Sequence, residues 1–249
     1  MKISIITITF NSAKTLQRAL DSVQHQNYPD IEHVLVDGAS TDGTREMIEA
    51  YAKQHPNVRW ISEPDEGIYN AINKGIALAT GDAIGFLHSD DIFHSSDSIG
   101  QIAAALEQKK ADVVYGDLQY VKGDRIVRQW KSNEYHPRSL KYGWMPPHPT
   151  VYVRREVYEQ VGKYDEWFRI SADYDMMLRI FTAGYKTCYI PEVLVCMEVG
   201  GASNKNSKAR LSKTQEDRIV LLKNHVGAGI LTVACKQLRK INQFICHKS

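Results

Sequence analysis

Apolar residues follow two different spacings over residues 1–95 of the chain. Short apolar and β-branched runs, typical of buried strands, recur between segments in which apolar residues have helical spacing. The connections between these segments are short. This order predicts a β-α-β-α-β-α-β unit with a mostly parallel sheet and right-handed crossovers. The predicted strands are residues 2–9, 33–36, 58–61 and 82–87, and the predicted helices are residues 15–26, 44–54 and 68–79.

The pattern changes after residue 95, and residues 206–246 look largely helical. No repeat and no low-complexity linker interrupts the chain. We therefore expect one continuous α/β domain over residues 1–204, with a smaller antiparallel part, and a helical tail over residues 205–249. The further elements predicted are helices near 98–108 and within 169–183, and strands 112–121, 125–130, 150–153, 186–190 and 194–197.

The composition is ordinary for a soluble protein. At 249 residues, with 43% hydrophobic and 24% charged residues, the chain can bury a sizeable core. No apolar run approaches the roughly 20 residues that a membrane span requires, and the N-terminus has the pattern of a strand instead of a signal peptide. The four cysteines show no CxxC spacing, which favours free thiols over a zinc site or a disulfide framework. We therefore expect a cytoplasmic protein.

The net charge of +2 conceals an uneven distribution. From Lys205 onward there are ten Lys or Arg and two acidic residues, a charge of +8, whereas residues 1–204 hold 21 basic and 27 acidic residues, a charge of −6. The tail also places apolar residues beside Lys236, Arg239 and Lys240. Such a basic amphipathic helix predicts peripheral contact with an anionic membrane, or packing on the domain or on a second copy of the chain as a homodimer. We expect no nucleic-acid partner.

Two adjacent carboxylates, Asp90 and Asp91, follow the predicted strand 82–87. Open α/β sheets bind ligands at the carboxyl ends of their strands. Two carboxylates crowded there repel each other, and a divalent cation such as Mg²⁺ or Mn²⁺ relieves this repulsion and bridges protein to phosphate. The competing interpretation is a solvated Asp-Asp turn before the helix that follows Ser95.

Asp37 follows the predicted strand 33–36 and begins a segment with two glycines, VDGASTDGT over residues 36–44. A carboxylate at a strand end, next to glycines that let the backbone approach a ligand, can accept hydrogen bonds from a nucleobase or a ribose. A turn with Thr41 or Asp42 as a helix N-cap explains the same residues without a ligand.

Five motifs in order carry a resemblance to a known family. They are TFN (9–11), VDGASTDGT (36–44), DEGIYNAINKG (65–75), SDD (89–91), and ADYD (172–175) followed by LR (178–179). With this order and spacing, residues 1 to about 200 resemble the family 2 glycosyltransferases of the GT-A fold, especially bacterial enzymes that build surface polysaccharides.

The resemblance implies a Rossmann-like, mostly parallel central sheet. It implies an inverting, metal-dependent transfer of a hexosyl or N-acetylhexosaminyl group from a nucleotide-diphosphate sugar, often a UDP-sugar. The acceptor would be a glycan or a lipid-linked glycan, and the lipid-linked case would place the enzyme at the inner face of the cytoplasmic membrane. Residues 1–95 would then be the nucleotide-sugar half, and residues 96–204 the acceptor and catalytic half.

The resemblance also assigns the donor site residue by residue. Asp37 would contact the base, and the loop 9–11 would bound the nucleoside pocket. Many family members have a basic residue where Ile72 stands here, so one diphosphate contact is missing or is supplied by Lys74. Asp90 matches the last Asp of the family's Asp-x-Asp motif and is the expected metal ligand, with Asp91 beside it. The expected donor-binding residues are Thr9, Asn11, Asp37, Asp65, Asn73, Lys74, His88, Ser89 and Asp90.

Two positions depart from the family's pattern. His88 stands where the family usually has Asp or Asn, although a neutral histidine can still hydrogen-bond ribose or ligate a metal. Ala172 replaces the Glu of a Glu-Asp pair whose Asp is the base. Asp173 is therefore the expected general base, because an inverting transfer needs a group that takes the proton of the acceptor hydroxyl. Asp175 lies four residues before Arg179, which indicates a helical ion pair.

Trp144 and His148 belong to the proline-containing segment WMPPHPT, residues 144–150. In the resembling enzymes this region faces the acceptor, and aromatic faces stack on sugar rings, so both residues are expected acceptor contacts. A core tryptophan followed by proline turns is the alternative.

Three other functions require sequence features that can be compared with this chain. A sugar-nucleotide nucleotidyltransferase has a similar fold but needs a Gly-rich basic loop after the first strand, which residues 10–14 (FNSAK) lack. A dinucleotide dehydrogenase is disfavoured because no G-x-G-x-x-G follows that strand. A binding module that keeps only a nucleotide pocket stays open because of His88 and Ala172, although Asp90 and Asp173 argue against it.

Overall fold

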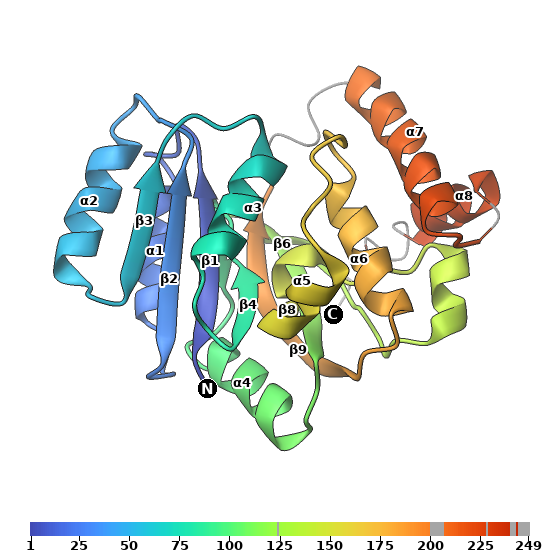
Figure 1. Ribbon diagram of the computed structural model, residues 1–249, viewed down its shortest axis with the longest axis horizontal. Coiled ribbons are helices and arrows are strands. Elements are labelled where there is room, and N and C mark those ends of the chain that lie inside the picture. Colours follow the sequence, from blue (N-terminus) through green and yellow to red (C-terminus); the bar gives the residue numbers. More distant parts are fainter. Residues whose placement is uncertain (124, 200–206, 228, 240–242, 244–249) are drawn as a thin grey trace.

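The computed structural model describes residues 1–123, 125–199, 207–227, 229–239 and 243, and it shows one nine-stranded sheet with helices on both faces (Figure 1). Its strands are β1 (Ile3–Thr9), β2 (Ile31–Asp37), β3 (Val58–Ser62), β4 (Ala83–Phe86), β5 (Asp91–Phe93), β6 (Val113–Lys122), β7 (Arg125–Trp130), β8 (Tyr152–Arg154) and β9 (Thr187–Glu198). Its helices are α1 (Leu16–Gln24), α2 (Thr44–Gln54), α3 (Ile68–Leu78), α4 (Ser98–Gln108), α5 (Arg155–Val161), α6 (Ala172–Thr182), α7 (Ser207–Lys223) and α8 (Ile230–Arg239), with short 3₁₀ helices η1 (Pro137–Tyr142) and η2 (His148–Thr150).

The strand order is β3-β2-β1-β4-β8-β6-β9-β5, and β7 pairs with β6 outside this row. Buried side chains form one large cluster that includes α3, α5 and α6, and a second that includes α1 and α4. These clusters lie on opposite faces of the sheet, as the positions of α3 and α1 in Figure 1 show. The predicted α/β architecture is confirmed.

The first four strands bring the predicted donor residues to one edge of the sheet. β1 is parallel to both β2 and β4, and β2 is parallel to β3. In this register Thr9 lies opposite Asp37, and Asp37 lies opposite Ser62. Strands β1 and β2 are buried on both faces, and the polar side chains within them bind each other, as Ser4 does Glu32 and Thr7 does His33.

The second half supplies the antiparallel part. β8 is antiparallel to β4 and to β6, β5 is antiparallel to β9, and β6 is parallel to β9. Gly85 in β4 makes the first of these contacts possible, because a Cβ there would lie 2.2 Å from the ring of Tyr152 in β8. Two strands were predicted over 186–197, but the structure has one, β9. Pro191, which lies between the two predicted strands, is part of an irregular stretch of β9 where the pairing with β6 shifts register.

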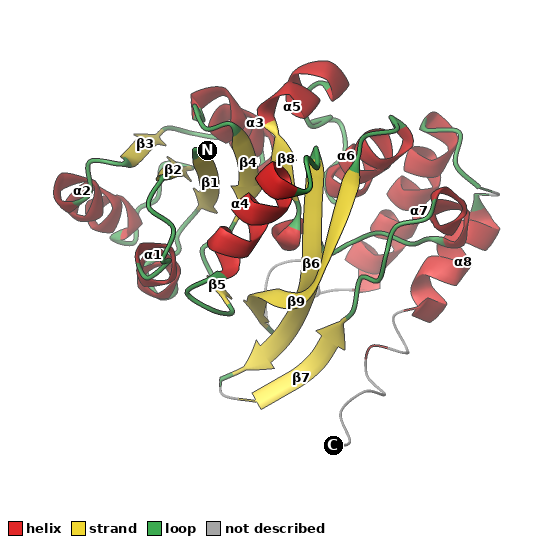
Figure 2. Ribbon diagram, turned by 90° about the horizontal axis from the view of Figure 1, so that it is seen from below, coloured by secondary structure: helices red, strands yellow, loops and turns green. Residues whose placement is uncertain are grey.

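The tail is helical where the structure describes it, as α7 and α8. α7 packs on α6, and α8 packs on α7 and η1 (Figure 2). Val220, Leu221 and Val233 are buried in the same cluster as the domain's core. The predicted packing of the tail on the domain is therefore observed for one of its faces. Of the helices described here, none combines the length and the apolar character needed to cross a bilayer.

Candidate active site

Two loops are tied together at the carboxyl ends of β1 and β2. The backbone N–H of Asn11 donates to Ser40 Oγ (2.8 Å), and Asn11 Oδ1 accepts from the backbone N–H of Thr41 (3.0 Å). Asn11 has a φ of 49°, in the left-handed region that asparagine tolerates, and this conformation turns the chain toward β2. Asn11 therefore holds the loop after β1 against the loop after β2.

Gly38 marks the place where these loops approach the segment after β3. A Cβ on Gly38 would lie 3.0 Å from Asp65 Oδ2 and 3.2 Å from the ring of Phe10. Phe10 is 68% exposed in spite of its apolar ring. An exposed ring beside a carboxylate can stack on a nucleobase and hydrogen-bond to its edge. The sequence reasoning did not single out Phe10, although its place directly after β1 is a signal that could have found it.

Asp37 is buried and holds the loops in place. Its carboxylate accepts from Thr9 Oγ1 (3.0 Å) and from Ser62 Oγ (2.7 Å). It also accepts from the backbone N–H (3.0 Å) and the hydroxyl (2.5 Å) of Ser40. These four donors occupy the carboxylate, so a direct contact with a base requires a hydroxyl to rotate away. In this conformation Asp37 and Thr9 hold the loops in place, and their contact with the donor stays a prediction.

Lys74 and Asp65 form an ion pair at the same end of the sheet. Lys74 Nζ lies 2.7 Å from Asp65 Oδ1 and 2.9 Å from Glu63 Oε1, and it donates to the carbonyl of Pro64 (2.9 Å). The hydrogen bond to Asp65 raises the pKa of Lys74, which is therefore charged at neutral pH. A charged lysine held by two carboxylates and one carbonyl can exchange these partners for a diphosphate.

Asn73 has a structural task, and the prediction that it contacts the donor does not fit the observed conformation. Its Nδ2 donates to the carbonyl of Tyr164 (3.0 Å) and to Glu166 Oε1 (2.6 Å), and its Oδ1 accepts from the N–H of Tyr164 (2.9 Å). The side chain is buried. Asn73 therefore fixes the segment around Tyr164 against α3, a contact between distant parts of the chain that its motif did not indicate.

His88, Ser89 and Asp90 follow β4 at the same edge of the sheet. Ser89 Oγ donates to Ser12 Oγ (3.0 Å), which joins this motif to the loop after β1. Burial lowers the pKa of His88, against the charges of Asp90 and Asp173, so the imidazole is neutral at neutral pH. Among the described residues, Asp90 has no hydrogen-bond or ion-pair partner. Its carboxylate is therefore available to a ligand.

Asp91 differs from its neighbour. It begins β5, it is only 1% exposed, and neither of its buried carboxylate oxygens has a hydrogen-bond partner within the described part of the chain. Burial, and next the charge of Asp90, raise the pKa of Asp91 well above its ordinary value. Direct metal binding by Asp91, as predicted, would require the surrounding residues to move. We therefore retain Asp90 alone as the proposed ligand.

Asp173 and Asp90 share a neighbour, His88, and a second histidine, His148, lies beside it. Asp173 lies in the first turn of α6, and its charge acts on both His88 and His148. The two imidazole rings are 6.1 Å apart between centroids. Burial lowers the pKa of His148 to about 4, and its Nε2 is 2.6 Å from the hydroxyl of Tyr164. The fold thus gathers into one site carboxylates that are far apart in the sequence.

Trp144 is a core residue, and its predicted contact with the acceptor is wrong for this conformation. The indole is 3% exposed, and its Nε1 donates to the carbonyl of Ser132 (2.7 Å). Its ring lies edge-on to Tyr115 and Phe181 and is tilted against Tyr135. Buried tryptophans typically satisfy their N–H in this way. His148 lies at the site, and its acceptor contact stays a prediction.

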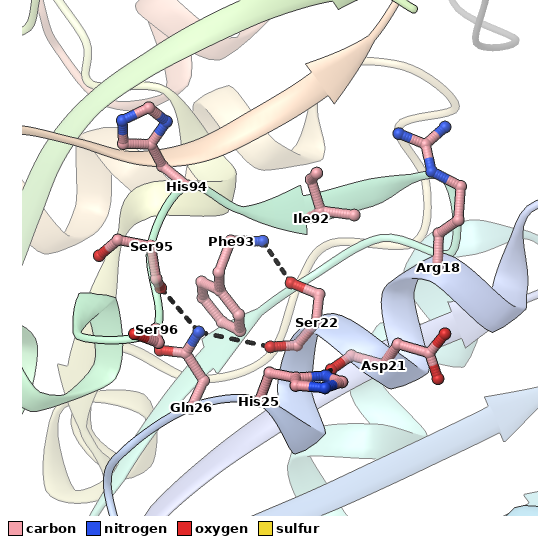
Figure 3. A pocket seen from close by; sticks show the side chains of 10 residues that line it. All are labelled: Arg18, Asp21, Ser22, His25, Gln26, Ile92, Phe93, His94, Ser95 and Ser96. Atoms are coloured by element: carbon pink, nitrogen blue, oxygen red, sulfur yellow. Dashed lines mark hydrogen bonds between the residues drawn. The ribbon is translucent and has the colours of Figure 1, made fainter. Parts of the chain in front are cut away.

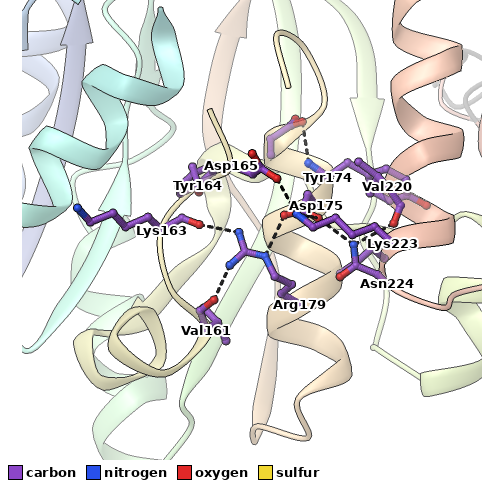
Figure 4. A network of polar contacts seen from close by, with 12 residues as sticks. Val161, Lys163, Tyr164, Asp165, Tyr174, Asp175, Arg179, Val220, Lys223 and Asn224 are labelled. Atoms are coloured by element: carbon purple, nitrogen blue, oxygen red, sulfur yellow. Dashed lines mark hydrogen bonds and ion pairs between the residues drawn. The ribbon is translucent and has the colours of Figure 1, made fainter. Parts of the chain in front are cut away.

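Asp175 is the structural residue that the sequence indicated. Its Oδ2 accepts from Arg179 Nε (2.9 Å), which confirms the helical ion pair (Figure 4). Its Oδ1 accepts from Asn224 Nδ2 (2.9 Å) and lies 3.1 Å from Lys223 Nζ. The carboxylate is 0% exposed, so it cannot reach a substrate. It binds α6 to the end of α7.

A cavity of about 810 Å³ opens next to the start of α6, between the N-terminal end of α3, residues 166–169 and α7. Tyr69 joins this cavity to Asp173. Its hydroxyl donates to the carbonyl of Ile170 (2.6 Å), and its pKa is raised by burial and next by the charge of Asp173. Trp167, which lines the cavity, is 68% exposed. The sequence reasoning missed both aromatic residues.

A smaller cavity of about 370 Å³ lies between α1 and residues 92–96 (Figure 3). Its polar wall groups bind each other: the N–H of Phe93 donates to Ser22 Oγ (2.7 Å), and Gln26 Nε2 donates to the carbonyl of Ser95 (2.8 Å). None of the predicted site residues lines it. We therefore place the candidate active site at Asp90 and Asp173, not here.

The residues present fit a divalent cation held partly by substrate. Asp90 offers an unpaired carboxylate, whereas no group of three His, Cys, Asp or Glu among the described residues could hold a metal by itself. Mg²⁺ in particular is commonly bound by one or two carboxylates together with phosphates and waters. The protein's contribution therefore suits a metal that arrives with a diphosphate.

Comparisons with known proteins agree with this geometry. The model of glycosyl transferase family 2 matches residues 4–162. A "PGL/p-HBAD biosynthesis glycosyltransferase" of Mycobacterium bovis (strain BCG / Pasteur 1173P2) is 34% identical over 212 residues, covering 81% of this chain and 78% of the relative.

Solved structures resemble the chain at lower identity. S. aureus TarS 1–349 in complex with UDP-GlcNAc has a TM-score of 0.74 at 19% identity, over 100% of this chain and 74% of that one. The mannosyltransferase PcManGT from Pyrobaculum calidifontis, in complex with GDP-Man and Mn²⁺, has a TM-score of 0.67 at 22% identity, over 94% and 69%. This chain covers only 44% of the length of a longer TarS structure. Because the family model covers most of the chain and the fold agrees, this protein belongs to glycosyltransferase family 2 and has the GT-A fold.

Proposed function

We propose that the protein transfers a sugar, with inversion, from a nucleoside-diphosphate donor to a hydroxyl group of a glycan acceptor. The observation that carries the proposal is that Asp90 and Asp173, which are far apart in the sequence, both lie close enough to His88 for their charges to act on it. A bond forms between the acceptor oxygen and the anomeric carbon while the bond to the diphosphate breaks. Asp173 takes the proton of the attacking hydroxyl, and the nucleoside diphosphate leaves with the electron pair.

The donor half supports a nucleotide-sugar ligand. Phe10, Gly38 and Asp65 lie together at the carboxyl ends of β1 to β3, where the nucleoside would bind, and Lys74 would provide a positive charge for the diphosphate. A UDP-sugar is our first choice, because TarS is known bound to UDP and to UDP-GlcNAc. Another structure of the same fold holds GDP-Man, so the nucleotide is an outcome of the test.

Asp90 is the proposed metal ligand, with Mn²⁺ or Mg²⁺ as the cation. A bound cation would neutralise charge that develops on the leaving diphosphate. Neutral His88, two residues before Asp90 in the chain, can donate a hydrogen bond to a ribose or phosphate oxygen. PcManGT is known with Mn²⁺ bound, which supports the choice of metal.

A panel of nucleotide sugars tests the proposed function. Release of nucleoside diphosphate is measured with each donor, with and without Mn²⁺, together with thermal stabilisation. Turnover of one sugar nucleotide supports transfer. A protein that binds a nucleotide and turns over none of the sugars would be the nucleotide-binding module that His88 and Ala172 left open.

The large cavity beside Tyr69 is the proposed acceptor site. Its exposed wall residues combine the indole of Trp167 with the carboxylates of Glu66 and Glu166 and the amide of Gln215. Stacking on an aromatic face together with hydrogen bonds to hydroxyl groups is a mode that suits a neutral sugar ring. Trp167 thus replaces Trp144 as the proposed aromatic contact.

Trp167→Ala is expected to raise the KM for the acceptor about 3–10-fold, because the variant loses one stacking contact with the sugar. The donor KM should stay unchanged, because none of the residues proposed to bind the donor lines the cavity of Trp167. Initial rates with p-nitrophenyl glycosides as acceptors measure both constants. Trp167→Phe is the matched control and should keep most of the affinity. An acceptor KM that is unchanged in the alanine variant would remove Trp167 from the site.

Peripheral contact with a membrane remains a proposal for the outward face of α8. Ile230, Leu231 and Leu238 are each more than 60% exposed there. We expect sedimentation with anionic vesicles at low salt, and we expect Leu231→Glu to reduce it. Vesicles of neutral lipid serve as the control. Failure of the wild-type protein to sediment with anionic vesicles would leave this face to a second subunit or to solvent.

A further inference from the structure

The entry into the catalytic helix α6 is held by a carboxylate from the tail. Glu216 of α7 accepts hydrogen bonds from the backbone N–H groups of Ile170 and Ser171 (both 2.9 Å) and of Arg169 (3.4 Å). Glu216 is 9% exposed, and it also lines the large cavity beside Tyr69. These hydrogen bonds fix the three residues that lead into α6, and Asp173 follows Ser171 by two residues. The orientation of the proposed base therefore depends on a residue of the tail.

The next residue of α7 makes a second contact with the same place. Asp217 Oδ1 accepts from Ser171 Oγ (2.8 Å), and Asp217 Oδ2 accepts from Lys236 Nζ of α8 (2.9 Å). Ser171, Asp217 and Lys236 are all buried. The chain of contacts thus runs from α8 through α7 to the N-cap of α6.

Lys236 is held in a confined position. Its Nζ lies 3.2 Å from the centroid of the Tyr174 ring, and Tyr174 is the neighbour of Asp173. On the other side α8 touches the backbone at the end of η1, where a Cβ on Gly143 would lie 2.5 Å from Lys236 Cβ. Burial lowers the pKa of Lys236, while the charges of Asp217 and Asp173 oppose this effect. The ammonium is therefore enclosed between Asp217 and the ring of Tyr174.

We propose that Glu216, Asp217 and Lys236 are positioning residues for the reaction: the two carboxylates fix the entry into α6, and the ammonium of Lys236 holds Asp217 in place against Ser171. The proposal rests on the proposed role of Asp173 as base. It makes part of the tail, which lies beyond residues 4–162 of the family match, a component of the active site. The other titratable groups that face Asp173 are Tyr69 of α3, His88 after β4, Tyr120 of β6, His148 of η2 and Tyr164 before α6.

The contact between Asp217 and Lys236 is tested by Lys236→Met and Asp217→Asn. Each single variant should lower kcat and leave the donor KM within about twofold of the wild type, because each loosens the entry into α6 without touching the donor. The double variant should lose no more than the larger of the single losses, because both substitutions break the same contact.

The geometric part is tested by Glu216→Ala. Without the three hydrogen bonds the start of α6 can shift, and a misplacement of about 1 Å can cost on the order of 10²-fold in rate. We expect kcat to fall at least about 10-fold while the donor KM changes less than about twofold. Arg218→Met, an exposed neighbour on α7, is the control and should resemble the wild type.

Two results would overturn the proposal. One is a kcat that is unchanged in Glu216→Ala. The other is an equal loss of donor binding and kcat in that variant, which would indicate general loosening of the fold. A wild-type protein that turns over no sugar nucleotide would contradict the proposed function, whereas an active wild type together with a fully active Glu216→Ala variant would contradict this proposal alone.

Discussion

Asp173→Asn is expected to abolish most turnover and to leave donor binding intact. Loss of a general base typically costs about 10²–10⁴-fold in rate. The amide oxygen of Asn can still accept the hydrogen bond that Asp173 Oδ1 receives from the N–H of Tyr174 (2.7 Å), so the first turn of α6 should keep its shape. Single-turnover rates with the active sugar nucleotide, and titration with nucleoside diphosphate, separate the two quantities.

Asp175→Asn is the matched comparison, because the two carboxylates are two residues apart on the same helix. Asp175 is buried between Arg179 and Lys223, and removal of one partner of a buried ion pair costs roughly 3–5 kcal/mol of stability. This variant should therefore melt at a lower temperature and keep its kcat where it is folded. If Asp173→Asn keeps turnover within about threefold of the wild type, well short of the expected loss, the base must be another group.

The second large effect is expected for Asp90→Ala. This variant should lose the metal-dependent part of nucleotide binding and, with it, detectable turnover. Asp90 lacks a partner among the described residues, so its removal should hardly change the melting temperature. Calorimetric titration with nucleoside diphosphate, with Mn²⁺ and with EDTA, measures the metal-dependent part directly.

Asp30→Ala is a suitable control for the loss of one carboxylate. Asp30 is exposed and directly precedes β2, at the opposite edge of the sheet from the site. Its variant should bind nucleotide as the wild type does. Equal affinity of Asp90→Ala in EDTA and of the wild type in Mn²⁺ would mean that Asp90 holds no metal.

The elements that set the position of the site could be predicted from the sequence because they depend on local patterns. The apolar runs of β1 and β2, and the helix period between them, are visible in short windows. Their parallel order then places Asp37 and Asp90 at one edge without any knowledge of side-chain contacts. Asp175 could be assigned as structural for a similar reason, because its partner Arg179 lies one helical turn away.

The assignments that failed, or that need revision, depend on contacts between distant segments. Asn73 belongs to a donor-site motif, but its hydrogen bonds go to Tyr164 and Glu166, about ninety residues later. Trp144 fills an aromatic cluster formed by strands and helices on both sides of it in the sequence. Glu216 looks like an ordinary polar residue on a helix, and only the packing of α7 on α6 shows its role. No window of the sequence contains both members of such a pair.

The hydrogen bonds from Glu216 to the start of α6 have a consequence for the order of events during synthesis. A ribosome adds about 5–20 residues per second, so the 43 residues from Asp173 to Glu216 follow after about 2–9 seconds. Strands β1 to β4 and their helices, which N-terminal segments can form first, are complete well before then. A nascent chain can thus assemble a nucleotide pocket while its proposed base is still unanchored. The enzyme would acquire ligand binding earlier than the capacity for chemistry.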